Sequence, residues 1–437
     1  MSKFPPSLIS RWPETFSTVV RQIRAPLITN SIYLLAGSFG SAALAFVFWT
    51  LAARMISPEA VGLVVAANSA INILVLLSDL GLGRGIVRFA SSEVEKALDI
   101  VNSSVAIVWI ASILLGIVFL IGIPLWAPGL AAIRTEKILE IGFVLFTAVI
   151  SLLNLQAAAM LSKRRGSFSF WRYSISSLLS IPLLLVFAQI INGVKATFLS
   201  FNIPNLLIFL ITSLFILPSF FNGYRFFGYF NLGVTLRLTR YASANYIATL
   251  LWQIPIYALP LIASNVISAE ATAYFYLPWI IAISVLSIPQ LVSISLFAEG
   301  SYNATALSSL VRKAALFIVL LVTPIILVLW FWGGSILGII GKNYVNIQLL
   351  RLILISIIPY TINVVYSAYL RVSMQLKRLV AVSIIMSISV LGLAYILGSE
   401  IGSVGLAIGW LSGQAIASIS ILAFYGFDHI RSRRGKI

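Results

Sequence analysis

The sequence contains no cysteine and only one histidine, His429, close to its end. The lack of cysteine excludes disulfides, thiolate chemistry and iron–sulfur ligation, and a lone histidine excludes a metal site built from His or Cys. Charge is scarce as well, since charged residues make up 9% of the 437 residues. Soluble domains carry about 25%. The composition therefore excludes an ordinary soluble domain.

The residues that are present are mostly apolar: 60% are hydrophobic, and the mean hydropathy is +1.05. A membrane-spanning helix needs about 20 apolar residues, so twelve such helices would use roughly 240. Loops and tails take up the remainder, which leaves no room for a separate soluble domain. We therefore predict an all-α integral membrane protein with about twelve transmembrane helices. The predicted spans are 28–52, 60–83, 100–123, 139–161, 171–191, 197–218, 242–265, 271–297, 313–335, 347–370, 379–397 and 402–425.

The segment 1–27 does not have the pattern of a signal peptide, because charges such as Arg11 and Arg24 interrupt it. Its apolar residues recur at helical spacing between Phe16 and Leu27, which predicts an amphipathic helix on the cytoplasmic membrane surface.

The distribution of basic residues predicts the orientation of the chain. If the N-terminus is cytoplasmic, all but six of the 29 Lys and Arg residues fall in the inner segments, as the positive-inside rule requires. An even number of spans then places both termini in the cytoplasm, including the basic tail 426–437. Lys and Arg residues confined to short loops determine the membrane topology, so the net charge of +17 does not indicate a nucleic-acid partner. The six exceptions are Arg54, Arg134, Lys137, Lys195, Lys342 and Arg351.

An internal repeat with an offset of 211 residues divides the chain into halves. The sequence Ile-Ser-Pro-Glu-Ala at 56–60 matches Ile-Ser-Ala-Glu-Ala at 267–271, and Leu-Glu-Ile at 139–141 aligns with Leu-Arg-Leu at 350–352. Each match precedes or opens an equivalent span in a six-plus-six arrangement. Six helices are an even number, so the repeat is parallel, with a pseudo-two-fold axis along the membrane normal. We predict an N-lobe at 28–218 and a C-lobe at 242–425.

The first copy of this motif also has the pattern of a helix start. Ser57 is a capping residue, Pro58 suits the first helical position, and Glu59 complements the helix dipole. Between the lobes, residues 219–241 are rich in aromatics and arginine. Such a composition predicts an interfacial linker on the cytoplasmic surface.

Polar residues inside spans are costly in lipid, so they face either a neighbouring helix or a wet cavity. Asn68, Asn72 and Asp79 fall within about 40° of one another around the second span. The other polar rows step by four residues: Asn245, Thr249 and Gln253 in the seventh span, and Asn363, Ser367 and Arg371 in the tenth. Helix–helix hydrogen bonding and a substrate cavity both account for these rows.

Charged residues gather at the cytoplasmic end of the second span, where Asp79, Arg84 and Arg88 lie close in sequence. They are either an interfacial salt bridge with topology-setting arginines or an entry site, since arginine pairs bidentately with phosphate. Asp79 is also a candidate for coupling to H⁺ or Na⁺. Arg54, at the outer end of the first span, is either an exit-side contact or a snorkelling residue.

Several short motifs lie at or near span ends: the stretch 53–62 (Ala-Arg-Met-Ile-Ser-Pro-Glu-Ala-Val-Gly), Ser-Asp-Leu-Gly-Leu-Gly at 78–83, Phe-Ala-Glu-Gly at 297–300, Arg351, and Tyr-Leu-Arg at 369–371. These motifs resemble those of polysaccharide biosynthesis proteins, the Wzx-like flippases of lipid-linked oligosaccharides. The resemblance covers most of the chain. The superfamily also contains the MATE multidrug antiporters and MurJ-type flippases of peptidoglycan precursors.

The resemblance implies a MATE-like fold, alternating access between the lobes, and a lipid diphosphate-linked oligosaccharide as substrate, carried across the cell membrane. A two-lobed transporter needs no second copy to form its path, so a monomer is expected. Glycosyltransferases of the same pathway are the implied protein partners. A cation-coupled exporter of small amphipathic molecules is the main alternative, followed by another secondary transporter or a lipid scramblase. No Walker-type phosphate loop occurs and 219–241 contains no acid, so neither an ATPase nor an enzyme is expected, and no cofactor.

Overall fold

A computed structural model of the chain describes residues 40, 43–224, 231–302 and 304–434. Over this part of the chain all regular structure is helical. The predicted N-terminal helix 1–27 lies outside the described residues. The principal helices, after an initial helix Ala43–Met55, are α3 (Pro58–Ser78), α4 (Leu82–Ser92), α5 (Ala97–Trp126), α6 (Lys137–Ser162), α7 (Ser167–Ile190), α8 (Gly193–Ile211), α9 (Leu217–Phe220), α10 (Leu232–Val266), α11 (Ala269–Tyr302), α12 (Leu307–Ile340), α13 (Ile347–Ile355), α14 (Ile357–Val372), α15 (Leu376–Ile401) and α16 (Ser403–Arg434).

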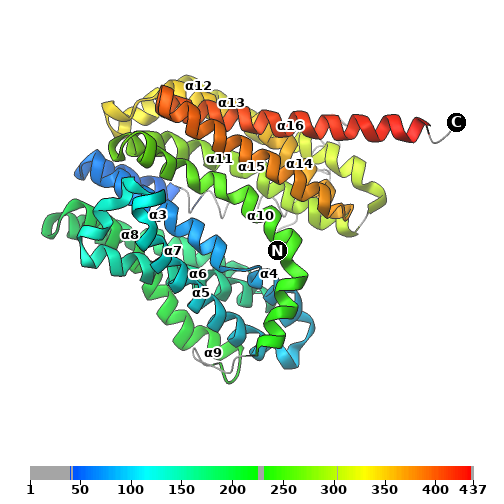
Figure 1. The fold of residues 1–437 in the computed structure, drawn as a ribbon, viewed down its shortest axis with the longest axis horizontal. Helices are drawn as coiled ribbons and strands as arrows, with labels where there is room; N and C mark the ends of the chain where they lie inside the picture. The colour runs from blue at the N-terminus through cyan, green and yellow to red at the C-terminus, as the bar shows by residue number, and fades with distance from the viewer. Residues whose placement is uncertain (1–39, 41–42, 225–230, 303, 435–437) are drawn as a thin grey trace, which may run out of the picture.

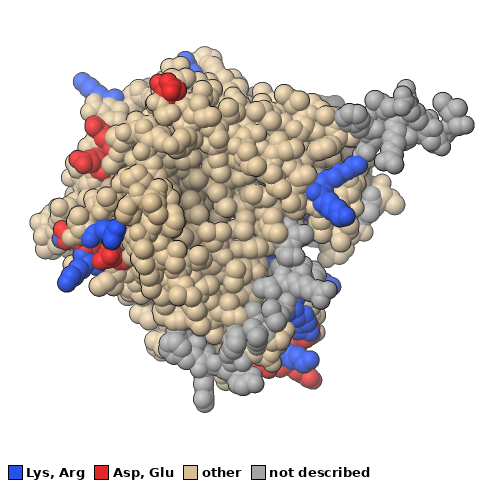
Figure 2. Space-filling model, viewed as in Figure 1, with Lys and Arg blue, Asp and Glu red and all other residues tan. Residues whose placement is uncertain are grey.

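Eleven helical segments within the described residues are long and apolar enough to cross a membrane, and they match the second to twelfth predicted spans. The helix Ala43–Met55 is the described part of the first. The fold class predicted from the sequence is therefore confirmed. Figure 2 shows why a membrane suits this surface: charged side chains gather at two opposite ends of the molecule, with a broad uncharged band between them.

The second span is shorter than predicted, since α3 ends at Ser78 rather than at 83. Leu80 and Gly81 have φ angles of 50° and 80°, in the left-handed region that terminates a right-handed helix. A separate short helix, α4, then carries Arg84 and Arg88.

The helices form two lobes, joined by the long helix α10 (Figure 1). The N-lobe holds Ala43–Met55 and α3 to α9, and the C-lobe holds the spanning part of α10, Asn245–Val266, together with α11 to α16. A buried apolar cluster draws on both lobes, and Trp49 of the N-lobe lies edge-to-face with Tyr276 of α11 at 5.1 Å between ring centroids. The lobes are therefore packed together and not merely tethered.

The helix starts reproduce the repeat seen in the sequence. Starts in the second half follow their counterparts by 209 to 211 residues. Both copies of the serine cap are formed, since Ser57 Oγ accepts from the Ala60 amide at 3.4 Å and Ser268 Oγ from the Ala271 amide at 3.0 Å. The paired starts are Pro58 and Ala269, Ala97 and Leu307, Lys137 and Ile347, Ser167 and Leu376, and Gly193 and Ser403.

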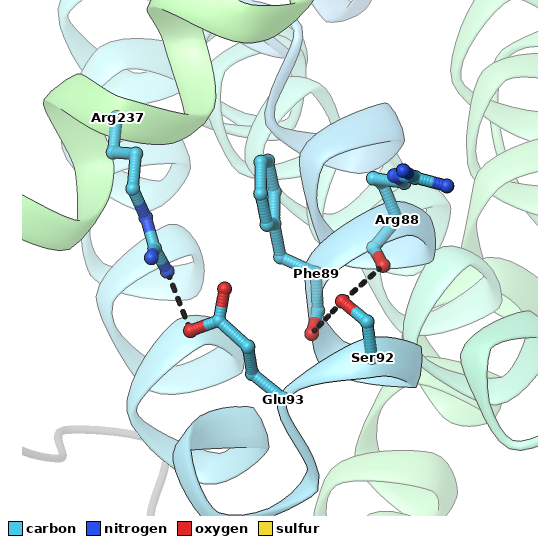
Figure 3. Close-up of polar contacts among 5 residues, drawn as sticks. All are labelled: Arg88, Phe89, Ser92, Glu93 and Arg237. Atoms are coloured by element: carbon cyan, nitrogen blue, oxygen red, sulfur yellow. Dashed lines mark hydrogen bonds and ion pairs between the residues drawn. The ribbon is translucent and has the colours of Figure 1, made fainter.

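The predicted linker 219–241 is partly helical, because α10 begins at Leu232 and continues without interruption into the seventh span. Leu238 is fully buried, and Arg237 pairs with Glu93 beyond α4 at 2.9 Å (Figure 3). The arginine also lies 4.9 Å from the centre of the Phe89 ring. Arg237 and Leu238 of the predicted linker therefore pack against the N-lobe, and the position of the linker at the membrane surface stays a prediction.

Candidate functional site

The lobes contact each other at the end of the molecule where α3 and α11 begin, called the closed end below. A Cβ on Gly62 would lie 1.6 Å from the Ala269 carbonyl oxygen, so the two helices approach to a distance that only glycine allows. The Arg54 guanidinium donates to the Ile339 carbonyl at the end of α12, with Nε 3.0 Å from the oxygen. Arg54 therefore links the lobes at the closed end.

A second link at the closed end involves Asn265, which follows Arg54 by the repeat offset of 211 residues. Asn265 Nδ2 donates to the Trp126 carbonyl, and Asn265 Oδ1 accepts from the Gly129 amide, both at 3.1 Å. Arg54 and Asn265 thus occupy equivalent positions in the repeat, and each bonds to the last turn of a helix in the opposite lobe, α12 and α5 respectively.

Toward the other end of α3, side chains from both lobes line one cavity of about 270 Å³, the interlobe cavity. Arg84 comes from α4 of the N-lobe and Arg371 from the end of α14 in the C-lobe, with Gln253 of α10 between the lobes. Arg84 Nη1 donates to the Asn245 carbonyl at 2.5 Å, and Nη2 donates to Thr249 Oγ1. The lining residues are Arg84, Thr249, Trp252, Gln253, Gln290, Ser293, Ile294, Val364, Ser367 and Arg371, with no acid among them.

Asp79 lies in the turn just beyond the span Pro58–Ser78, beside the interlobe cavity. Its carboxylate accepts from the backbone amides of Gly81 and Gly83, each at 3.2 Å, and so caps the start of α4. Burial raises the pKa of Asp79, while the amides and the charge of Arg84 oppose that shift. Burial likewise lowers the pKa of Arg84, and the Asp79 charge opposes this shift.

A second polar cavity of about 240 Å³, the N-lobe pocket, lies among α3, α6, α7, α8 and α10. The predicted residues Asn68 and Asn72 line it from α3. Arg172, on the second turn of α7, is 4% exposed and donates from Nη2 to Asn154 Oδ1 at 3.0 Å. The lining residues are Asn68, Asn72, Val75, Leu76, Ile150, Asn154, Arg172, Tyr173, Ser176, Ser177, Ser180, Phe201, Asn205 and Tyr257.

Three predicted residues are placed differently. Asn363 is fully buried inside the C-lobe, where Nδ2 donates to Gln414 and Oδ1 accepts from Ser418, so it joins α14 to α16 and lines neither cavity. Arg88 is exposed and its side chain points away from the Glu93–Arg237 pair (Figure 3). Asn245 contributes its backbone carbonyl, which receives Arg84.

The most informative residue that the sequence analysis missed is Arg172. The predicted span began at 171, which made Arg172 look like an end residue, whereas α7 begins at Ser167. A signal was present: Arg172, Ser176 and Ser180 recur at steps of four, and these are the polar residues that α7 buries. The rest of α7 is largely exposed on the outside of the lobe, so its buried face is unusually polar.

The model of the family described as polysaccharide biosynthesis protein matches residues 27–278, more than half of the chain. The chain belongs to this family. The match covers the N-lobe and α10, and hence the whole N-lobe pocket and the Arg84 side of the interlobe cavity. Among curated proteins, none matches the chain.

Solved structures show the fold that this family member shares. The lipid II flippase MurJ in an inward closed conformation has a TM-score of 0.72 at 16% identity, over 90% of this chain and 87% of MurJ. An inward-facing multidrug resistance MATE family transporter of the MOP superfamily has a TM-score of 0.66 at 16% identity, over 90% and 95%. An outward-facing MATE transporter has 0.63 at 18%, over 96% and 99%. The chain is therefore a multi-pass membrane protein with the fold of these transporters and flippases.

Proposed function

We propose that this protein carries a lipid diphosphate-linked oligosaccharide across the cytoplasmic membrane by alternating access between its lobes. The observation that supports this most is the interlobe cavity, where Arg84 and Arg371 approach from opposite lobes with no acid in the lining. Two guanidiniums in a lining that holds no carboxylate suit an anion of high charge, and arginine binds phosphate oxygens in bidentate fashion.

The closed end supports the alternating-access part of the proposal. Contacts between Gly62 and Ala269, and between Arg54 and Ile339, join the lobes at one end, while both cavities lie toward the other. With both termini in the cytoplasm, the end near Arg84 is the cytoplasmic one. Glycosyltransferases that build the precursor on that side are the partners this function requires, and a monomer suffices for the path.

The alternative, a cation-coupled exporter of small amphipathic molecules, requires a site for a cation. Among the described residues, neither cavity is lined by Asp or Glu. The nearby carboxylate of Asp79 is engaged by two backbone amides. The charge of the cavities therefore favours an anionic cargo.

The test is transport of a fluorescent polyprenyl-diphosphate oligosaccharide in vesicles that contain the full chain. Arg84→Gln and Arg371→Gln should each lower the initial rate at least about tenfold, because each removes a charged hydrogen-bond donor that contributes about 1.5–3 kcal/mol. Arg88→Gln is the matched control, since it lies one turn from Arg84 on α4 but lines neither cavity, and it should retain the wild-type rate. Unchanged transport in the Arg84 and Arg371 variants, or export of a small cationic dye in place of the lipid, would overturn the proposal.

A further inference from the structure

Arg172 is a buried cation without a counter-ion. The residue is only 4% exposed, yet it forms no ion pair with any residue that the structure describes. A guanidinium has five N–H donors. One of them reaches Asn154, a neutral amide, and Nε has no hydrogen-bond partner. The Tyr173 ring, 4.4 Å from Arg172 Cζ, supplies only the partial compensation of a cation–π contact.

A lone charge of this kind is expensive to keep in a membrane protein. Charged residues inside spans normally pair with one another or face a functional cavity. Arg172 does the second, because it lines the N-lobe pocket together with four asparagines. Nothing in the described lining is acidic, so the pocket offers one positive charge to whatever enters it.

The remaining lining describes the neutral part of the ligand. Asn68, Asn72, Asn154 and Asn205 present amides from three helices, and Ser177 and Tyr257 add hydroxyl groups. Amides and hydroxyls both donate and accept hydrogen bonds, as the hydroxyl groups of a sugar require. The volume of about 240 Å³ falls below the range of about 300–1,000 Å³ of drug-sized sites, so it suits one sugar ring and not a whole oligosaccharide.

We propose that the N-lobe pocket binds one carboxylate-bearing sugar residue, whose carboxylate pairs with Arg172 while its hydroxyls contact the asparagines. The inference rests on the proposed function, because it assigns this pocket to the glycan and the interlobe cavity to the diphosphate. The division follows from charge: a single guanidinium matches one carboxylate, whereas Arg84 and Arg371 together match a diphosphate. The carried glycan is then acidic.

The test is binding of free glucuronate, glucose and inorganic phosphate to the full chain in lipid nanodiscs, measured by saturation-transfer NMR. Glucuronate should bind at least about tenfold more tightly than glucose. Because the interlobe cavity also attracts phosphate, phosphate is compared in the double variant Arg84→Gln, Arg371→Gln, where it should bind at least about tenfold more weakly than glucuronate. Arg172→Gln should weaken glucuronate binding at least about tenfold, and Arg84→Gln should leave it unchanged.

A second variant protects the test against misfolding. Asn154→Asp places a carboxylate where the amide now receives Arg172, so the guanidinium gains an internal counter-ion. The variant should unfold at the wild-type temperature or above it, yet lose glucuronate binding. Asn343→Asp adds the same charge at an exposed residue of the closed end and should bind glucuronate normally.

The outcomes separate the two proposals. Three outcomes overturn the inference. Equal binding of glucose would make the pocket a neutral-sugar site, and equal binding of phosphate in the double variant Arg84→Gln, Arg371→Gln would make it a general anion site. Glucuronate binding by Asn154→Asp would remove Arg172 from the contact. Transport of a neutral diphosphate-linked oligosaccharide should survive Arg172→Gln but not Arg84→Gln. Loss of this transport in both variants also overturns the inference, whereas glucuronate binding without any transport overturns the proposed function alone.

Discussion

Asp79 has two properties that point to different roles: a position beside Arg84, and hydrogen bonds to the amides of Gly81 and Gly83. The first suggests a site for a coupling H⁺ or Na⁺. The second is the geometry of a helix cap, which fixes the carboxylate where the chain turns from α3 into α4. Arg84 is carried by α4, so the cap also positions the interlobe cavity.

Two substitutions separate the roles of Asp79. Asparagine keeps one of the two acceptor oxygens and removes the charge, whereas alanine removes both oxygens and the charge. If the cap is the role, Asp79→Asn should transport at the wild-type rate, and Asp79→Ala should lose about 0.5–2 kcal/mol of unfolding free energy. Thermal unfolding and vesicle transport, with and without ion gradients, provide the measurements. Loss of gradient-driven transport in Asp79→Asn, with unchanged unfolding, would instead establish ion coupling.

At the residue scale, the sequence predicted which side chains line a cavity better where polar residues recurred at a regular helical spacing. The rows that contain Gln253 and Arg371 both reach the interlobe cavity, as steps of four on a helix allow. Asn363 belongs to the same row as Arg371 but bonds to Gln414, because which neighbouring helix a polar face meets depends on lobe packing. Arg172 was missed because its place relative to the helix start decides whether it is terminal or interior.

At the scale of elements, the contact between α3 and α11 holds the closed end together. Gly62 lies against the Ala269 backbone, where no side chain fits. We expect Gly62→Ala to destabilise the protein by about 1–3 kcal/mol, the usual cost of overpacking, or to separate the two helix ends. A lower unfolding temperature, read from tryptophan fluorescence, is the expected result.

The control for this substitution is Gly338→Ala on α12, where an added Cβ would meet nothing within 4 Å. It should raise the unfolding temperature slightly or leave it unchanged, since alanine favours helix. An equal loss of stability in both variants would show that the helix contact at Gly62 is not the cause.

The positions of the helices were largely predictable because the six-helix arrangement occurs twice. Each helix start is therefore indicated in both halves, as by the capping residues Ser57 and Ser268. The end of α3 was missed although a signal was present, because Gly81, with φ in the left-handed region, is the residue type that commonly follows a helix end. Leu80 also has a positive φ, which is uncommon for a residue other than glycine and could not be expected from the sequence. The start of α10 at Leu232 was missed for a different reason: the aromatic residues before it are also typical of a segment at a membrane interface.

At the scale of the whole molecule, alternating access requires the closed end to open. The absence of cysteine makes this testable without background labelling. Cysteines at Arg54 and Ile339, whose side chain and carbonyl are in contact, should be joined by a short bis-methanethiosulfonate reagent. We expect the cross-link to stop vesicle transport and a reductant to restore it.

The two single-cysteine variants, treated with the same reagent, are the controls and should keep most of their transport. Full transport through a cross-linked closed end would show that the lobes need not separate there. The two lobes were predictable from the repeat. The end at which they meet was not, because the same sequence has to allow both the inward-facing and the outward-facing conformation in an alternating-access cycle.

The arginines of the two cavities have an electrical consequence for the proposed transport cycle. No acid lines either cavity, and even with Asp79 beside Arg84 counted, Arg84, Arg172 and Arg371 leave net positive charge in the transmembrane field. Each charge moved through the full field changes the free energy by about 2.3 kcal/mol per 100 mV. If the proposed anionic cargo neutralises that charge, the loaded protein is nearly indifferent to voltage, while a negative interior draws the vacant protein back to face the cytoplasm. The membrane potential would then drive the return of the empty protein to its inward-facing conformation, and this step would favour net export of the lipid.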